Sequence, residues 1–162
     1  MEYKYIVGVD PGKKGAFGIV NKKGEFIAAF DMPLLKPENL IDEKVLVDLL
    51  RDLPHRAVVH IEKVNSMPRD GVTSAFSFGY GYGLVVGILR SFSYVIQRNR
   101  QDVLKKAYFQ PKSTKKDSLA LARSKYGKEH FPLEKHDGRA EACLIADYCR
   151  IHILGMKDDG KE

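Results

Sequence analysis

Three short runs of apolar and β-branched residues follow one another at the start of the chain, at 3–10, 15–20 and 25–30. The turns between them are short and contain glycine, with the sequences PGKK at 11–14 and NKKG at 21–24. Turns of this length join antiparallel neighbours, because parallel strands need a longer crossover. The N-terminal part of the chain therefore predicts three antiparallel strands of one sheet.

Helix and strand patterns alternate through the rest of the 162 residues. The spacing of apolar residues predicts a helix over 40–50, a strand over 57–61, a helix over 73–90 and a strand over 93–97. Further helices are expected over 102–108, 114–126 and 138–154, the second opening with a capping-box pattern of Thr114 and Asp117. This order predicts an α/β fold with a five-stranded mixed sheet, the first three strands antiparallel, and helices on both faces. With no repeat or composition break, a single domain over 1–162 is expected.

Composition narrows the class of protein further. A hydrophobic share of 44% and a charged share of 30% exclude a disordered or fibrous chain. Glycine interrupts the longest apolar run, so no membrane span is expected, and a strand so close to Met1 argues against a signal peptide. Cys143 and Cys149 are six apart on one expected helix and face different sides, so they cannot pair. A cytoplasmic location is expected.

The positive charge is concentrated in one segment. Residues 98–135 hold 11 Lys and Arg against four Asp and Glu, whereas the rest of the chain holds 16 against 17. Such a segment is either a solvated basic face or a surface for a polyanion such as nucleic acid. The choice depends on whether the rest of the chain supplies phosphate chemistry.

Four acidic residues are placed where such chemistry is expected. Asp10 ends the first strand directly before Pro-Gly, and Glu62 follows the apolar strand at 57–61. If the first strand is central, these two strand ends are neighbours. Asp137 and Glu141 are four apart at the start of the last helix and therefore lie on one face. Carboxylates at the ends of apolar strands are costly unless something pairs with them, so several together predict bound cations.

Carboxylate oxygens favour Mg²⁺ or Mn²⁺ over Zn²⁺. Two such ions about 3.5–4 Å apart support phosphodiester hydrolysis by ionising a water and stabilising the departing oxygen. The histidines and cysteines show no paired metal-ligand spacing, and no serine has a matched His and Asp setting. The carboxylates therefore predict a two-metal nuclease.

Each carboxylate also has an ordinary structural alternative. The alternatives are a turn for Asp10, an ion pair with Lys13 or Lys63 for Glu62, a helix N-cap for Asp137 and an exposed helix position for Glu141.

Four stretches, in their order and spacing, resemble the RuvC-type Holliday junction resolvases, and most closely the compact resolvases of bacteriophages. They are GVDPGKKGAFGIV, HIEKV, SAFSFGYGYGLVVGIL and DGRAEACLIADY. The resemblance extends over nearly the whole chain and implies a ribonuclease H-like fold. It also implies a homodimer in the cytoplasm (the host's, for a phage protein) that uses Mg²⁺, with Mn²⁺ as a substitute and two ions per site. Its expected activity is to resolve four-way and related branched DNA by paired nicks that leave 5′-phosphate ends, in DNA recombination and repair.

The resemblance assigns the catalytic and metal-binding roles to Asp10, Glu62, Asp137 and Glu141. Bacterial members place the last two acidic groups three apart with aspartate second, whereas here they are four apart and end in glutamate. The expected DNA-binding residues are Lys13, Lys14, Arg69, Phe76, Lys105, Lys106, Lys112, Lys115 and Lys116. For Phe76 and Phe78, core packing is the alternative to stacking on unpaired bases.

Gly79, Gly83 and Gly87 form a stripe at four-residue intervals on the helix expected over 73–90. Because glycine in a helix costs about 1 kcal/mol against alanine, three on one face indicate a close backbone approach, either to the sheet or to a second subunit. The alternative functions are a junction-binding architectural protein without activity and a nuclease for RNA:DNA hybrids.

Overall fold

The computed structural model describes residues 3–53, 57–63, 71–92, 94–100, 108 and 114–156. Within them, one five-stranded sheet has the order β3-β2-β1-β6-β7. Its strands are β1 (Tyr5–Asp10), β2 (Ala16–Asn21), β3 (Phe26–Asp31), β6 (Ala57–Lys63) and β7 (Val95–Arg100). The first three pair antiparallel, whereas β6 runs parallel to both β1 and β7. The predicted mixed sheet is confirmed.

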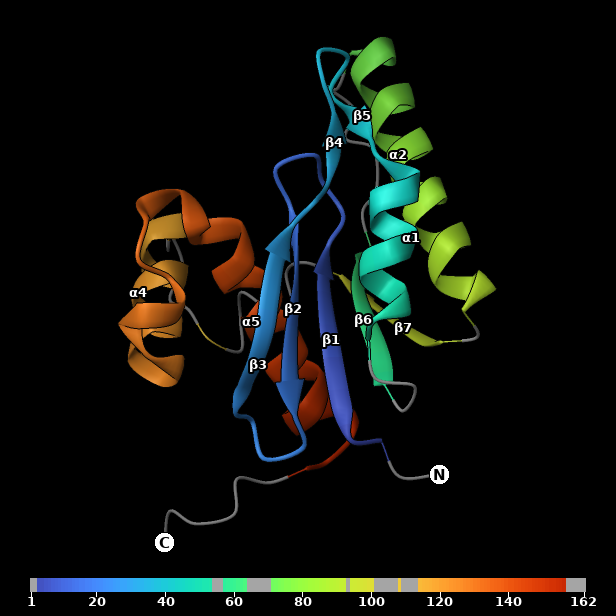
Figure 1. Ribbon diagram of the computed structural model, residues 1–162. Helices are drawn as coiled ribbons and strands as arrows, with labels where there is room; N and C mark the ends of the chain where they lie inside the picture. The colour runs from blue at the N-terminus through green and yellow to red at the C-terminus, as the bar shows by residue number, and fades with distance from the viewer. Residues whose placement is uncertain are drawn as a thin grey trace, which may run out of the picture.

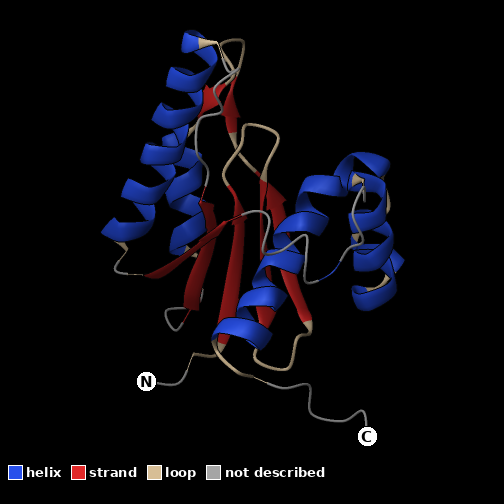
Figure 2. Ribbon diagram, turned by 180° about the vertical axis from the view of Figure 1, so that it is seen from behind, coloured by secondary structure: helices blue, strands red, loops and turns tan. Residues whose placement is uncertain are grey.

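Helices cover both faces of this sheet, as predicted (Figures 1 and 2). On one face lie α1 (Glu43–Arg51) and α2 (Val72–Ser91), and on the other lies α5 (Asp137–Tyr148) with α4 (Lys115–Tyr126) beside it. Each face has its own apolar core, one formed with α1 and α2 and one formed with α4 and α5.

Successive side chains of β1 point to opposite faces of the sheet, and this alternation determines which of them pack into each core. Val7 and Val9 belong to the core under α1 and α2, while Ile6 belongs to the core under α5. Because successive side chains of a strand point to opposite faces, Gly8 and Asp10 share the α5 face with Ile6.

Two glycines allow α5 to lie close against the sheet. Gly8 and Gly18 are paired directly across β1 and β2. A Cβ at Gly8 would overlap the backbone oxygen of Ala142, and a Cβ at Gly18 would overlap the backbone nitrogen of Cys143. The backbone of α5 therefore rests on this glycine pair, and a larger residue at either position would displace the helix.

A short hairpin between β3 and α1 differs from the sequence-based prediction. β4 (Leu34–Leu35) pairs antiparallel with β5 (Leu40–Ile41). The helix expected from residue 40 begins only at Glu43, after the N-cap Asp42, whose side chain accepts a hydrogen bond of 3.0 Å from the Val45 N–H. Strands of two residues are too short to show an alternation pattern, and their apolar pair resembles the start of a helix.

The C-terminal helices agree with the prediction except near their end. α4 begins with the predicted capping box, in which the Asp117 carboxylate accepts a hydrogen bond of 2.6 Å from the Thr114 N–H. α5 continues as a π-helical turn over Cys149–Ile153, where one uninterrupted helix is expected. Cys143 and Cys149 are free, as predicted. Both are buried, and burial raises the pKa of each thiol to about 12. Of the helix expected over 102–108, only residue 108 is described.

A buried ion pair joins α5 to its surroundings. Asp147 and Arg150 are both 0% exposed, with 2.9 Å between the Arg150 Nε and the Asp147 Oδ1. The Asp147 Oδ2 accepts a hydrogen bond of 2.9 Å from the Tyr108 hydroxyl and lies 2.7 Å from the Lys125 Nζ. Because removing one partner of a buried pair leaves an uncompensated charge, substitution of Asp147 or Arg150 alone should be strongly destabilising.

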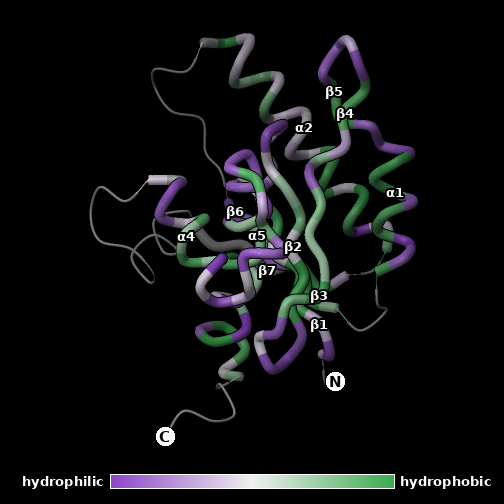
Figure 3. Tube along the Cα trace, turned by 60° about the vertical axis from the view of Figure 1, so that its left-hand side comes forward, coloured by the Kyte–Doolittle hydropathy of each residue, from purple (hydrophilic) through white to green (hydrophobic). Residues whose placement is uncertain are grey.

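α2 is apolar along most of its length, but its own chain covers little of it. Its buried residues are Val85, Val86 and Leu89, near its C-terminal end. Val72 and Phe76, near its N-terminal end, are 88% and 75% exposed. Figure 3 shows white and green over most of α2, whereas α1 alternates between green and purple.

By length and composition, α2 is the one helix in the described part of the chain that is long and apolar enough to cross a membrane. The expectation that glycine leaves no apolar stretch of this length is therefore wrong, because the helix and its apolar character continue through the glycines. In this fold the C-terminal part of α2 packs against the sheet.

The glycine stripe of α2 faces away from the sheet. A Cβ at Gly79, Gly83 or Gly87 would meet no atom of the described residues within 4 Å. Of the two partners predicted for the stripe, the sheet of the same chain is therefore excluded.

Candidate active site

Asp10 and Glu62 lie side by side at one edge of the sheet. β1 and β6 are parallel, and their register pairs Val9 with Ile61, so the next residues on each strand are Asp10 and Glu62. Neighbouring strands lie about 4.8 Å apart. Glu62 also shares the α5 face with Val58, four residues earlier on the same strand. Both carboxylates therefore point to the α5 side of the sheet, and Glu62 is only 8% exposed.

The first turn of α5 reaches the same edge. A Cβ at Gly138 would lie 2.8 Å from the Lys14 backbone oxygen and 3.8 Å from the Ala16 Cβ. Ala16 is the antiparallel partner of Asp10. Asp137 directly precedes Gly138 and Glu141 follows one turn later, so the start of α5 brings its two acidic residues to the edge where β1 ends. The backbone positions of the four predicted acidic residues therefore fall at this end of the sheet.

Hydrogen bonds to neighbouring groups involve Asp10, Asp137 and Glu141. The Asp10 Oδ1 accepts from the Gly12 N–H at 3.3 Å, so Asp10 also fulfils the predicted turn role. The Asp137 Oδ1 accepts from the Gly138 N–H at 2.9 Å, and the Glu141 Oε1 lies 3.4 Å from the hydroxyl of Ser118 on α4.

The four carboxylates fit a hard divalent cation in donor type, because oxygen is the donor that Mg²⁺ and Mn²⁺ prefer. Their side chains do not close into a ligand set. No group of three or more His, Cys, Asp or Glu side chains in the described part of the chain is arranged to hold a metal ion. The fit is therefore one of donor chemistry and location.

Asp137 is not the N-cap of α5. Its φ of −56° and ψ of −41° are helical, whereas an N-cap has a non-helical backbone. A 3₁₀ turn over Glu134–His136 leads directly into α5, so the helix begins with Asp137 and the cap position falls on His136. The alternative that gave Asp137 a capping role is therefore wrong, and its carboxylate lies in the first turn.

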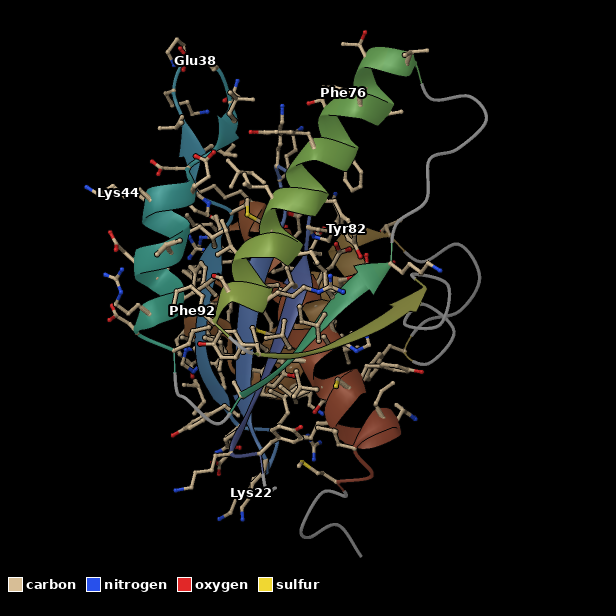
Figure 4. All side chains as sticks on the ribbon, turned by 90° about the vertical axis from the view of Figure 1, so that its right-hand side faces the viewer. Lys22, Glu38, Lys44, Phe76, Tyr82 and Phe92 are labelled. Carbon is tan, nitrogen blue, oxygen red and sulfur yellow. The ribbon has the colours of Figure 1, made fainter. Side chains whose placement is uncertain are left out.

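Four of the predicted DNA contacts fall on described side chains. Lys13 and Lys14 are exposed in the turn after Asp10, and Lys116 is exposed in the first turn of α4. Phe76 projects from the upper part of α2 (Figure 4), so core packing is excluded for it. Arg69, Lys105, Lys106 and Lys112 lie outside the described residues, and the side chain of Lys115 is not described.

Three polar residues beside the carboxylates carry no role in the sequence-based prediction. His136 is 7% exposed, its Nδ1 has no hydrogen-bond partner among the described residues, and burial lowers its pKa. Arg139, in the first turn of α5, pairs with Asp31 at the end of β3. Their separation of 108 residues left no sequence signal for this contact.

No family model and no curated protein matches the sequence. Among solved structures, the chain is similar to Thermus thermophilus RuvC, both in a structure of that protein and in its complex with a Holliday junction substrate. For each, the TM-score is 0.64 at 18% identity, over 94% of this chain and 97% of the other. The chain therefore has the ribonuclease H-like fold of RuvC.

Proposed function

We propose that the protein is a structure-specific endonuclease that resolves four-way DNA junctions and related branched DNA. The observation that carries this proposal is the placement of Asp10 beside Glu62 at the edge reached by the first turn of α5. A binding protein gains nothing from four carboxylates where phosphates must approach, because like charges repel. The fold shared with a RuvC bound to a Holliday junction substrate supports the same substrate class.

We expect Asp10, Glu62, Asp137 and Glu141 to hold two Mg²⁺ ions, with Mn²⁺ as a substitute. Bound there, the metal would ionise water and stabilise the departing oxygen. If the 3′ oxygen departs, the phosphate would stay on the 5′ end and the other end would be a 3′-hydroxyl. The chain itself positions the donors: the β-strand register fixes the first two and α5 carries the other two. Rotamer changes at the last two would be needed to close the ligand set.

Exposed lysines near this edge suit a DNA backbone. Lys13 and Lys14 lie in the turn that follows Asp10, and Lys116 lies on the helix whose Ser118 contacts Glu141. Phosphate contacts from such residues supply most of the sequence-independent affinity for DNA. Exposed Phe76 is suited to stacking on unpaired bases at a crossover.

A homodimer accounts for the uncovered face of α2. Cutting both strands of a symmetric junction requires two active sites, and one chain supplies one. Gly79, Gly83 and Gly87 leave open space along α2, and Tyr80 between them is 54% exposed. A second copy of α2 would cover this apolar stripe at close backbone distance.

The test is nicking of a synthetic four-way junction in Mg²⁺, with the Asp10→Asn variant as the control. We expect symmetric nicks from the wild type and none above background from the variant, with junction binding retained in Ca²⁺ or EDTA. Tight junction binding without metal-dependent nicking would favour the inactive architectural protein. Faster cleavage of an RNA:DNA hybrid than of the junction would overturn the substrate class.

A further inference from the structure

Arg139 and Asp31 form a two-pronged ion pair beside the carboxylates. The Arg139 Nε donates to the Asp31 Oδ1 at 2.7 Å, and the second nitrogen, Nη2, donates to the Asp31 Oδ2 at 2.8 Å. Parallel bonds of this kind fix the relative orientation of the two side chains as well as their distance. The hydrogen bond from Arg139 lowers the pKa of Asp31, and the same bond raises the pKa of Arg139.

The pair spans the edge at which the active site lies. Asp31 ends β3 and is the antiparallel partner of Ala16, which is in turn the partner of Asp10. Arg139 lies between Asp137 and Glu141 in the sequence. The ion pair therefore ties the acidic first turn of α5 to the same row of the sheet that contains Asp10.

Carboxylates that share a corner repel one another, and this repulsion acts to lift the first turn of α5 from the sheet. The glycine contacts at Gly8 and Gly18 hold α5 further along the helix, at Ala142 and Cys143. At the first turn, the bidentate contact to Asp31 opposes the repulsion. The α5 carboxylates need such a tie because metal ligands tolerate little displacement.

The small stabilising energy expected for this ion pair indicates that its role is geometric. Arg139 is 28% exposed and Asp31 is 57% exposed, so solvent screens the attraction. Exposed ion pairs of this kind contribute little to the free energy of unfolding. The pair is thus a weak stabiliser of the fold but a specific constraint on one helical turn.

From this arrangement we infer that Arg139 and Asp31 are positioning residues that hold Asp137 and Glu141 in reach of Asp10 and Glu62, so that the four bind divalent metal together. The inference rests on the proposed metal-dependent function.

A positioning role and simple electrostatics predict opposite changes in the metal affinity of the Arg139→Gln variant. Arg139→Gln removes a positive charge beside the site, which alone would tighten metal binding, whereas loss of positioning weakens it. Asp31→Asn weakens metal binding in either case. The conclusive comparison therefore includes Arg139→Gln, Asp31→Asn and their double variant. Arg51→Gln is the matched control, because Arg51 pairs with Asp48 at 3.1 Å on α1, on the opposite face of the sheet.

The readouts are the Mg²⁺ concentration for half of the metal-induced thermal shift and the concentration for half-maximal junction nicking. We expect both to rise about tenfold in each single variant, and no further in the double variant. The melting temperature without metal should change by less than about 4 °C, and Arg51→Gln should leave both Mg²⁺ concentrations unchanged.

An unchanged or lower Mg²⁺ requirement for Arg139→Gln, or additive effects in the double variant, would overturn the inference while leaving the nuclease proposal intact. If the wild type binds Mg²⁺ but cuts no DNA, the thermal shift still tests the positioning, and only the proposed function fails. A wild type that shows no metal-induced shift would overturn the inference.

Discussion

Gly8 and Gly18 face each other across β1 and β2, and the backbone of α5 occupies the space that a side chain at either position would need. The contact lies two residues before Asp10 on β1 and one residue after Glu141 on α5. The glycine pair therefore sets how closely the α5 carboxylates approach those at the strand ends.

Gly8→Ala should destabilise the protein and reduce nicking more than its stability loss explains. The added methyl group overlaps the Ala142 backbone, and overpacking of this kind costs about 1–3 kcal/mol in unfolding free energy. Urea unfolding and nicking rates at saturating Mg²⁺ measure the two effects. Gly71→Ala is the control, since a Cβ there meets nothing among the described residues within 4 Å, and its cost should stay within about 1 kcal/mol. Equal behaviour of the two variants would contradict the packing role of Gly8.

Neutralising either acidic residue of α5 should separate binding from cleavage. Asp137→Asn and Glu141→Gln are each expected to slow nicking by about 10²-fold or more, because each removes a charged metal ligand. Metal-free junction binding should tighten or stay the same, since a negative charge beside phosphate is lost. Gel-shift assays in EDTA and nicking assays in Mg²⁺ measure the two properties, with exposed Glu129→Gln as the control. Full activity of one variant would remove that residue from the metal site.

His60 should make the protein less stable in mild acid. Burial lowers its pKa to about 4, and its Nδ1 has no hydrogen-bond partner among the described residues. His60 is protonated near pH 6.5 in the unfolded chain but only near pH 4 in the folded chain. Stability from neutral His60 is therefore complete above about pH 6.5 and falls by roughly 3 kcal/mol as the pH drops to 4.

Urea unfolding between pH 7 and pH 4 should show this slope in the wild type and a shallower one in His60→Phe. The phenylalanine keeps an aromatic ring near Tyr148, whose ring centroid lies 6.2 Å from that of His60. Parallel pH profiles for the two proteins would assign the acid sensitivity to other groups.

A charge on the glycine stripe should separate the proposed dimer. Gly83→Lys places a long side chain where the described residues leave open space, so the subunit should fold normally. Light scattering is expected to show a dimer for the wild type and a monomer for the variant. Junction cleavage should change from paired to single nicks. A variant that remains dimeric would place the interface elsewhere.

The sequence predicted the sheet well because its signals are local. Short glycine-bearing turns determine the three antiparallel strands, and the apolar run at 57–61 identifies β6. The hairpin β4–β5 was missed because two-residue strands carry no periodicity, and the cap of α5 was misplaced because a 3₁₀ turn precedes Asp137 without a break.

The candidate site was also predictable only in part. Asp10 and Glu62 were predictable as neighbours from two strand ends and an assumed parallel pairing, which the register of β1 and β6 confirms. The contact of Arg139 with Asp31 was not predictable, because it depends on how a C-terminal helix lies across the end of β3. Exposure of Phe76 likewise depends on how far α2 extends past the sheet, which composition does not indicate.

Because so little of α2 is buried, the proposed dimer would make the solution behaviour of this protein depend on its concentration. α2 has twenty largely apolar residues, and only three of them are buried. A monomer therefore exposes an apolar surface, for which detergents, lipids and misfolded proteins would compete with the second subunit. Dilution of the protein should therefore expose this helix to proteases and promote adsorption to vessel surfaces. A high protein concentration should protect the helix.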